Sequence, residues 1–189
     1  MGEGVVLKKS PEELYEGRWE RITTALSLKV PDRVPIVPSI SVTPGFVARY
    51  GGVTIQEIMY DYEKCASIHE RLIEDFPEWD AILPPLGIWS APVFDASGQI
   101  LYKISGKELP PNISFQYVEG CYMDAEDYDF LIDDPNEYLI TKYLPRIFRE
   151  EWDKGSVRAS MALMKGAFAF SHYLDFWDGK FTEWREKLG

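Results

Sequence analysis

Apolar residues near the start of the chain recur at the spacing of one helix face. The residues on this face are Tyr15, Trp19, Ile22 and Leu26. Their separations of four, three and four positions match the period of an α-helix. Ser10 precedes Pro11, and Glu13 follows three positions after Ser10, which is the pattern of a capping box with proline in the first turn. The pattern predicts an amphipathic helix from residue 11 to about residue 28.

A second amphipathic stretch lies further along the chain. Thr54 and Glu57 form another capping box, and Asp61 is placed to cap a longer helix that starts one residue later. The expected buried stripe of this longer helix is Cys65, Ile68, Leu72 and Phe76. Pro77 ends it, because proline lacks the backbone N–H that a helix interior requires. The pattern predicts a helix over 62–76.

Short apolar runs follow both amphipathic stretches. The run at 34–41 is rich in Val and Ile but contains two prolines, so a strand there is brief or needs no backbone donor at those positions. Residues 80–83 predict a second short, buried strand. Between these regions the chain is expected to turn at 44–45 and at 51–52. Helix followed by strand indicates an α/β fold.

The remainder of the chain predicts a hairpin followed by helices. The expected elements are hairpin strands at 99–104 and 113–118, a short helix from Asp124, helices over 135–152 and 156–176, and an amphipathic end at 181–189. Pro145 is expected to kink or divide the helix over 135–152 near Tyr143. Because no repeat or long linker interrupts the chain, we expect a flexible tail at 1–9 and a single α/β domain at 10–189.

Charge and composition exclude several classes of protein. The 189 residues include 20 Lys and Arg against 31 Asp and Glu, a formal net charge of −11 that leaves no basic face for a phosphate backbone. No apolar stretch approaches the ~18 residues that a membrane span requires. Only two cysteines occur and they form no CxxC pair, which fits a reducing compartment. We therefore expect a cytoplasmic protein that binds neither nucleic acid nor membrane.

Residues able to bind a metal or act as a nucleophile are few. Cys65 and His69 stand one helical turn apart and could share a metal, but two ligands do not make a site and Cys65 belongs to the apolar stripe. His172 lies among aromatic residues and is expected to be packed. The chain contains no GxSxG, GxGxxG or GxxxxGK[ST] motif. From these residues we predict no metal site and no catalytic triad.

Short motifs nevertheless resemble one protein family. The stretches that carry the resemblance are 21–26, the "PDRVP" of 31–35, 52–54, "WDAI" at 79–82, and 119–146 with "EGCYM" and "YLPR". They are similar to the opening of the uroporphyrinogen decarboxylase family, in which a helix leads through "DR.P" into the first barrel strand. The last stretch is similar to decarboxylase-like members of anaerobes. The resemblance covers roughly residues 18–150.

The family resemblance implies a (β/α)₈ barrel with its active site at the carboxyl ends of the strands. Such barrels typically take ~250 residues. A chain of 189 residues with two or three barrel strands is too short to close one in the usual way. We therefore expect an α/β fold that is the amino-terminal portion of a TIM-like barrel with a β-hairpin excursion, its remainder missing or supplied by another chain.

Two departures from the family pattern bear on the substrate. The family's arginine-rich "RQAGRY" segment falls across 40–45, where Ile40 and Pro44 replace the arginines that hold substrate carboxylates. Its "FSDI" aspartate falls near 84–86, where no aspartate stands. An acidic protein without the arginine clamp is poorly matched to an anionic porphyrinogen. Porphyrinogen decarboxylation stays an alternative, and the resemblance favours the sister branch of corrinoid-dependent methyltransferases.

The methyltransferase hypothesis implies a role in C1 or methyl-group metabolism, with a small-molecule or corrinoid-protein substrate. Zinc and a corrinoid would serve the complete protein, since the family's zinc ligands lie in the later part of the barrel; for this chain we expect no cofactor. Near the strand ends, Glu119 is the predicted acid or base. The expected substrate-binding residues are Ser39, Ser41, Trp89 and Arg33, with Pro84 beside them and a structural role at the barrel rim as the alternative for Arg33.

A second hypothesis comes from a different class of function. In it the chain is a non-catalytic half-barrel that completes or regulates another subunit, as a homo-oligomer or with a complementary barrel half. It predicts an exposed apolar surface where strands are missing. Whether this chain catalyses a reaction by itself is left open.

Overall fold

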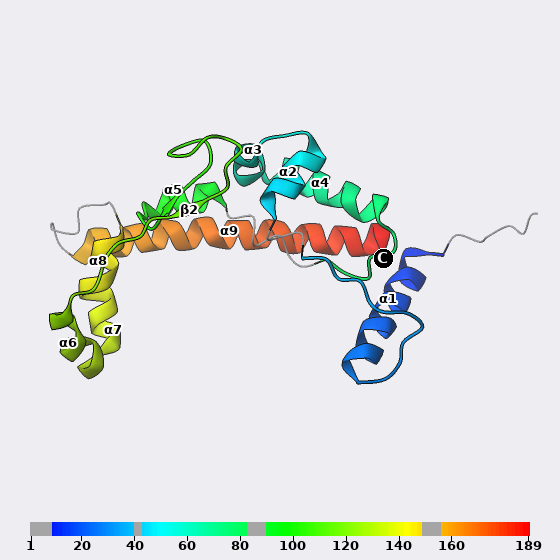
Figure 1. The fold of residues 1–189 in the computed structure, drawn as a ribbon, viewed down its shortest axis with the longest axis horizontal. Helices are drawn as coiled ribbons and strands as arrows, with labels where there is room; N and C mark the ends of the chain where they lie inside the picture. The colour runs from blue at the N-terminus through cyan, green and yellow to red at the C-terminus, as the bar shows by residue number, and fades with distance from the viewer. Residues whose placement is uncertain (1–8, 40–42, 83–89, 149–155) are drawn as a thin grey trace, which may run out of the picture.

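A computed structural model describes residues 9–39, 43–82, 90–148 and 156–189. Its axis is α9 (Ser156–Leu188), a helix of 33 residues that runs the length of the molecule in Figure 1. Along one side of α9 lie α2 (Pro44–Gly51), α3 (Ile55–Tyr60), α4 (Tyr62–Asp75) and α5 (Ala91–Ser97). On the other side α1 (Pro11–Leu26) projects near the carboxyl end of α9 (Figure 1). The molecule is therefore elongated and mostly helical.

A second group of short helices projects at the opposite end of α9 (Figure 1). It consists of η3 (Ala125–Asp127), α6 (Tyr128–Asp133), α7 (Pro135–Tyr138), the π-helical η4 (Leu139–Tyr143) and α8 (Leu144–Ile147). The predicted division of the helix near Tyr143 is confirmed, because the π-helical turn separates α7 from α8 just before Pro145. The short helix expected from Asp124 is confirmed as η3 and α6.

Both predicted capping boxes are confirmed. The Ser10 hydroxyl accepts a hydrogen bond from the Glu13 N–H at 3.2 Å, and the Glu13 carboxylate accepts one from the Ser10 N–H at 2.8 Å. Thr54 and Glu57 repeat this exchange at 3.2 Å and 2.8 Å at the start of α3. Asp61 caps α4 through the Lys64 N–H. These helix starts follow from local side-chain chemistry alone.

Two helices form where the sequence predicted only turns or irregular chain. Helix α2 has a proline in its first turn and ends at Gly52, whose φ of 69° is left-handed. Helix α5 begins after Ser90, which accepts a hydrogen bond from the Val93 N–H at 3.2 Å, and ends at Gly98 with a φ of 65°. Proline after the start and glycine after the end are helix boundary signals. The turns predicted at 44–45 and 51–52 lie at the two ends of α2, but neither α2 nor α5 was predicted from the sequence.

The predicted barrel strands are absent from the residues that the structure describes. Residues 34–39 and 80–82 belong to no helix or sheet, and the Asp80 N–H donates one backbone bond to the Ile36 oxygen at 2.8 Å. Pro35 and Pro38 lack N–H groups, and no further strand lies beside them among the described residues. The expectation of strands over 34–41 and 80–83 is thus wrong for this described part.

The β-hairpin is confirmed, though it is shorter than expected. Its strands are β1 (Tyr102–Lys103) and β2 (Gln116–Tyr117), which pair antiparallel with Tyr102 opposite Tyr117. The rings of this pair meet edge-on at 5.5 Å. Helices and a small sheet are both present, so the chain combines α and β elements. The described sheet is antiparallel, unlike the parallel sheet of a barrel.

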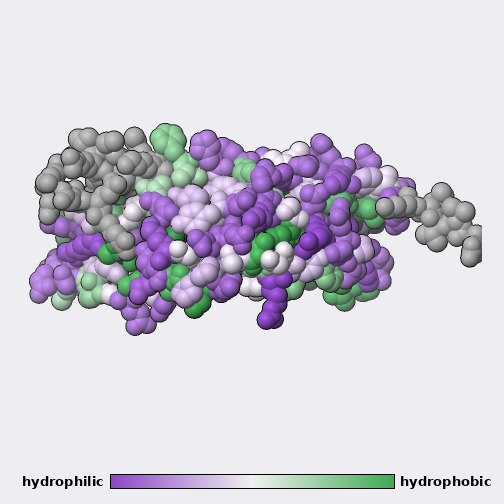
Figure 2. Space-filling view, turned by 90° about the horizontal axis from the view of Figure 1, so that it is seen from above, coloured by the Kyte–Doolittle hydropathy of each residue, from purple (hydrophilic) through white to green (hydrophobic). Residues whose placement is uncertain are grey.

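The core lies where α4 packs on the carboxyl-terminal half of α9. Its members include Cys65, Ile68, Leu72, Tyr173, Trp177 and Trp184. Figure 2 shows hydrophilic residues over much of the face seen from above, with smaller apolar patches between them. Among the described helices, none is both long enough and apolar enough to cross a membrane.

Candidate functional site

The residues predicted from the family resemblance fall in different parts of the structure. Ser41, Pro84 and Trp89 lie outside the described residues. Ser39 is exposed. Glu119 is also exposed, and within the described part of the chain its carboxylate has no hydrogen bond or ion pair. These positions do not form a described catalytic cluster.

Arg33 belongs to an ion-pair cluster centred on Asp80. The Asp80 side chain is fully buried and accepts hydrogen bonds from the Arg33 guanidinium at 2.7 Å and 2.9 Å. Arg21 of α1 donates to the same carboxylate. The Ile36 N–H completes the set at 2.8 Å. A buried carboxylate needs such charge-assisted bonds, since it has lost its hydration shell.

A second aspartate extends the cluster towards solvent. Arg21 donates two parallel hydrogen bonds to the Asp32 carboxylate, at 2.6 Å and 2.7 Å. These bonds lower the pKa of Asp32 to about 2. Burial alone would raise the pKa of Asp80, but the Ile36 N–H and the two guanidinium groups outweigh it, so this pKa is lowered. Both aspartates are therefore ionised, and hydrogen bonds from arginine side chains hold them in place.

The contacts of Arg33 support a structural role rather than substrate binding. Its guanidinium also donates to the Glu78 oxygen at 2.8 Å and to the Val34 oxygen at 3.1 Å. Four of its five N–H donors are thereby used, which leaves one for a ligand. Neither Asp80 nor Arg21 was predicted from the sequence as a site residue, although the lone aspartate at the start of the apolar run 80–83 was a signal of a paired buried charge.

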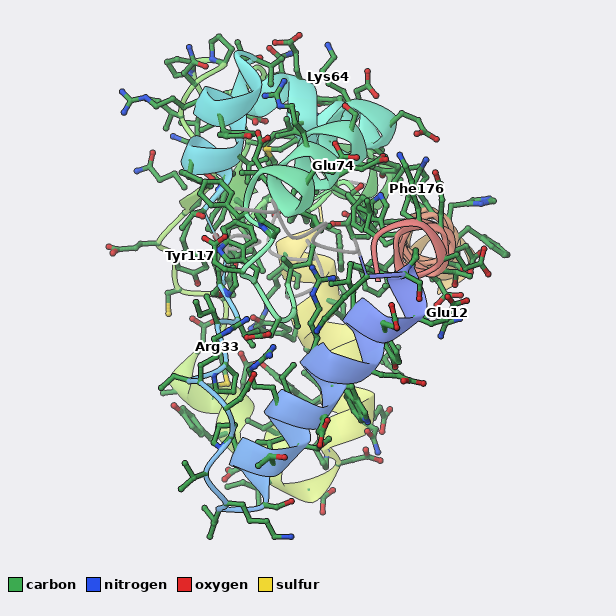
Figure 3. All side chains as sticks on the ribbon, turned by 90° about the vertical axis from the view of Figure 1, so that its right-hand side faces the viewer. Glu12, Arg33, Lys64, Glu74, Tyr117 and Phe176 are labelled. Carbon is green, nitrogen blue, oxygen red and sulfur yellow. The ribbon has the colours of Figure 1, made fainter. Side chains whose placement is uncertain are left out.

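The cluster holds the segment that follows α1, whose apolar side chains are exposed. Figure 3 shows Arg33 on the segment that runs back beside α1. We call its exposed hydrophobic residues the apolar edge: Leu26, Leu28, Val30, Val34, Ile36 and Val37. Leu28 is 96% exposed and Val34 is 80% exposed. No residue of α1 is buried. Several exposed apolar residues on one stretch of chain are compatible with an interaction surface.

The cysteine and histidine considered as metal ligands are packed in the core. The Cys65 sulfur lies 3.7 Å from His69 Nδ1, which lies 2.8 Å from the Cys65 carbonyl oxygen. Burial raises the pKa of the thiol to about 12 and lowers that of the imidazole. No third ligand joins them within the described chain, so these residues do not fit a zinc ion. The predicted burial of Cys65 is confirmed, but His172 is exposed rather than packed.

A scan against protein-family models finds no match, and neither does a search of curated proteins or of solved structures. The function proposed below therefore rests on the geometry of this chain and on the short motifs quoted above.

Proposed function

We propose that this chain is uroporphyrinogen-decarboxylase-like, of the methyltransferase branch, and that its own role is to bind a complementary polypeptide. Because the described residues form no barrel strand, that polypeptide would supply the strands of the barrel. The apolar edge is the observation that supports this proposal, because it leaves six hydrophobic side chains exposed between residues 26 and 37. The proposal makes the chain a binding partner first, with catalysis a property of the assembled protein.

The ion-pair cluster fixes part of the apolar edge in place, where a partner could bind it. Arg21 and Arg33 fix Asp80, and Asp80 holds Ile36 through both its backbone N–H and its backbone oxygen. The segment is therefore held in place at Ile36 before any partner arrives. A fixed segment loses less conformational entropy on binding a partner than a free one does.

The resemblance assigns the chemistry of the complete protein to methyl transfer. Since Cys65 and His69 do not fit zinc, the complementary polypeptide would have to supply the metal ligands. If the assembled protein is an enzyme, it should contain zinc and transfer a methyl group. A purely regulatory assembly should show neither. Tight binding of a coproporphyrin-type compound that weakens as salt rises would instead favour porphyrinogen decarboxylation.

The size of the protein in its native cell tests the proposal. Immunoblotting with intact-mass measurement is expected to find a polypeptide much larger than 21.8 kDa, or a 21.8 kDa chain in a stoichiometric complex with a second barrel half. The first result places the complementary strands on the same polypeptide, and the second places them on a partner. A monodisperse monomer of 21.8 kDa would refute the proposal.

A pair of matched variants localises the binding surface. Val34→Asp adds a charge to the apolar edge, whereas Ile132→Asp adds one to α6, where the side chain is 77% exposed. V34D is expected to weaken assembly at least tenfold, because a carboxylate would be buried without a partner. I132D is expected to leave it within twofold. Equal effects of the two variants would show that the apolar edge is not the contact.

A further inference from the structure

A cavity lies between α2, the start of α3 and the loop that precedes β2, on the side of α9 opposite α1 (Figure 1). Its volume is about 430 Å³. The residues that line it are Gly45, Ala48, Arg49, Val53, Ile55 and Asn112. Ala48 and Ile55 are buried, whereas Arg49 and Asn112 are exposed, so the cavity has an apolar base and a polar mouth. It uses neither the ion-pair cluster nor the apolar edge and is therefore independent of the proposed function.

The two polar side chains at the mouth are hydrogen-bond donors without a partner. Within the described chain, neither the Arg49 guanidinium nor the Asn112 amide makes a hydrogen bond or an ion pair. A guanidinium offers five N–H donors and an amide offers two. No carboxylate from the described residues lines the cavity. On the neighbouring α3, the Glu57 carboxylate is already paired with Lys64 at 2.7 Å. The mouth is therefore rich in donors and positively charged.

The donors belong to separate elements that the fold holds together. Arg49 lies on α2, and Asn112 lies on the loop that precedes β2. This loop is fastened to α3, because the Gln56 N–H donates to the Pro111 oxygen at 3.0 Å. The hydroxyl of the buried Ser105 donates to the same oxygen at 2.7 Å. Asn112 follows directly after this anchored position, so its backbone is placed before any ligand binds.

We propose that this cavity binds a small phosphate monoester, with the phosphate on Arg49 and Asn112 and a short hydrocarbon body against Ala48 and Ile55. Donors on two elements suit a tetrahedral oxyanion, whose oxygens point in different directions. The planar guanidinium matches two of those oxygens. The volume of about 430 Å³ lies within the ~300–1,000 Å³ of small-molecule sites, so an ester body fits beside the phosphate.

Titration with propyl phosphate, 1-propanol and butyrate tests this site. The alcohol keeps the alkyl body without the charge, and butyrate replaces the tetrahedral anion with a planar one. Propyl phosphate is expected to bind with a Kd on the order of 1 mM, as is reasonable for about eight heavy atoms, and the other two at least fivefold more weakly. The backbone NMR signals of Gly45 and Asn112 are expected to shift. Butyrate binding as tightly as propyl phosphate, no saturable binding, or shifts confined to residues outside the cavity would overturn the proposal.

Substitutions of Gly45 separate charge from shape at the mouth. Gly45 lies one helical turn before Arg49, and the position that a Cβ would take there has open space around it. Gly45→Glu puts a carboxylate beside the guanidinium and is expected to weaken propyl phosphate binding at least fivefold. Gly45→Ala adds only the methyl group and is expected to change the affinity less than twofold. Equal affinities of G45E and G45A would contradict the proposed role of Arg49.

Substitutions of Arg49 test the guanidinium itself. Arg49→Gln is expected to weaken propyl phosphate binding at least tenfold, and Arg49→Lys to weaken it less, because lysine keeps the charge but lacks the planar fork. The control Lys142→Gln removes an exposed positive charge from η4 and is expected to leave the affinity within twofold. Unchanged unfolding midpoints would show that each variant is folded. A loss in K142Q as large as that in R49Q would assign the binding to overall charge and overturn the site.

Discussion

Helices α1 and α4 have the same kinds of N-cap and apolar stripe, but the stripe of α4 is buried and that of α1 is exposed. Each has an oxygen-bearing cap and an apolar stripe at helical spacing. The stripe of α4 is buried beneath Tyr173, Trp177 and Trp184 of α9. The stripe of α1 is not, and Trp19 at its centre is 56% exposed. The pattern specifies that a helix forms and which face is apolar, but burial requires a second apolar surface at the right place.

The two helices are also fixed to the molecule by different forces. Apolar burial and ring contacts hold α4, with His69 edge-on to Trp177 at 5.9 Å. Arginine side chains hold α1, since Arg18 reaches the end of α9 and Arg21 reaches Asp80. Partly exposed ion pairs contribute less than a buried core does. We therefore expect α1 to open locally at a lower free energy than the α4–α9 body.

The largest expected effect comes from truncating an aromatic residue in the body. Trp177 is 2% exposed and contacts the rings of His69, Tyr173 and Trp184. W177A should lower the free energy of unfolding by about 3–5 kcal/mol, because it removes buried apolar area and leaves a cavity. Trp19→Ala on α1 is the matched control and should cost less than about 1 kcal/mol. Denaturant unfolding measures both, and equal losses would mean that α1 is packed as tightly as the body.

The second effect concerns the buried carboxylate that fixes α1. Asp80→Asn keeps the shape of the side chain but removes the charge that Arg21 and Arg33 neutralise. We expect a loss of about 2 kcal/mol and a clear fall in the hydrogen-exchange protection of α1. Glu63→Gln provides the control, since its ion pair with Lys180 joins the body and Glu63 is 71% exposed. Unchanged protection of α1 in D80N would show that the cluster does not anchor the helix.

The third effect is a pH dependence confined to the body. Burial lowers the pKa of His69 below its ordinary value of 6.5. The folded protein therefore binds fewer protons than the unfolded chain once the pH falls below about 6.5, so stability decreases there by at most about 1.4 kcal/mol per pH unit. Unfolding measured from pH 8 to pH 5 should show this slope. H69L should remove it and H172Q should keep it; an unchanged slope in H69L would assign it to another group.

The smallest expected effect compares the two capping boxes. Thr54→Ala removes the cap of α3, whose residues Ile55, Ile58 and Met59 are buried, and should lower global stability by about 1 kcal/mol. Ser10→Ala removes the equivalent cap of α1, which buries no residue. Its effect should be local, as faster hydrogen exchange in α1 with an unchanged unfolding midpoint. A full global loss in S10A would contradict the difference between the two regions.

The sequence by itself determined features that depend on neighbouring residues. The capping boxes at Ser10 and Thr54, the end of α4 before Pro77, the division of the helix near Pro145 and the antiparallel hairpin were all predictable. Each is set within a few residues by hydrogen-bonding capacity or by backbone sterics. The packing of Cys65 also followed from its position on an apolar stripe.

Only the tertiary structure decided which of these elements are covered and which charged groups meet. Arg21, Arg33 and Asp80 are separated by up to 59 positions, and nothing local brings them together. A β-strand needs a neighbour to supply its hydrogen bonds, and the apolar run at 34–39 forms no strand because no strand lies beside it among the described residues. The continuous 33-residue α9 likewise became a scaffold through the helices that pack along it. Local preference sets the element, and long-range packing sets its environment.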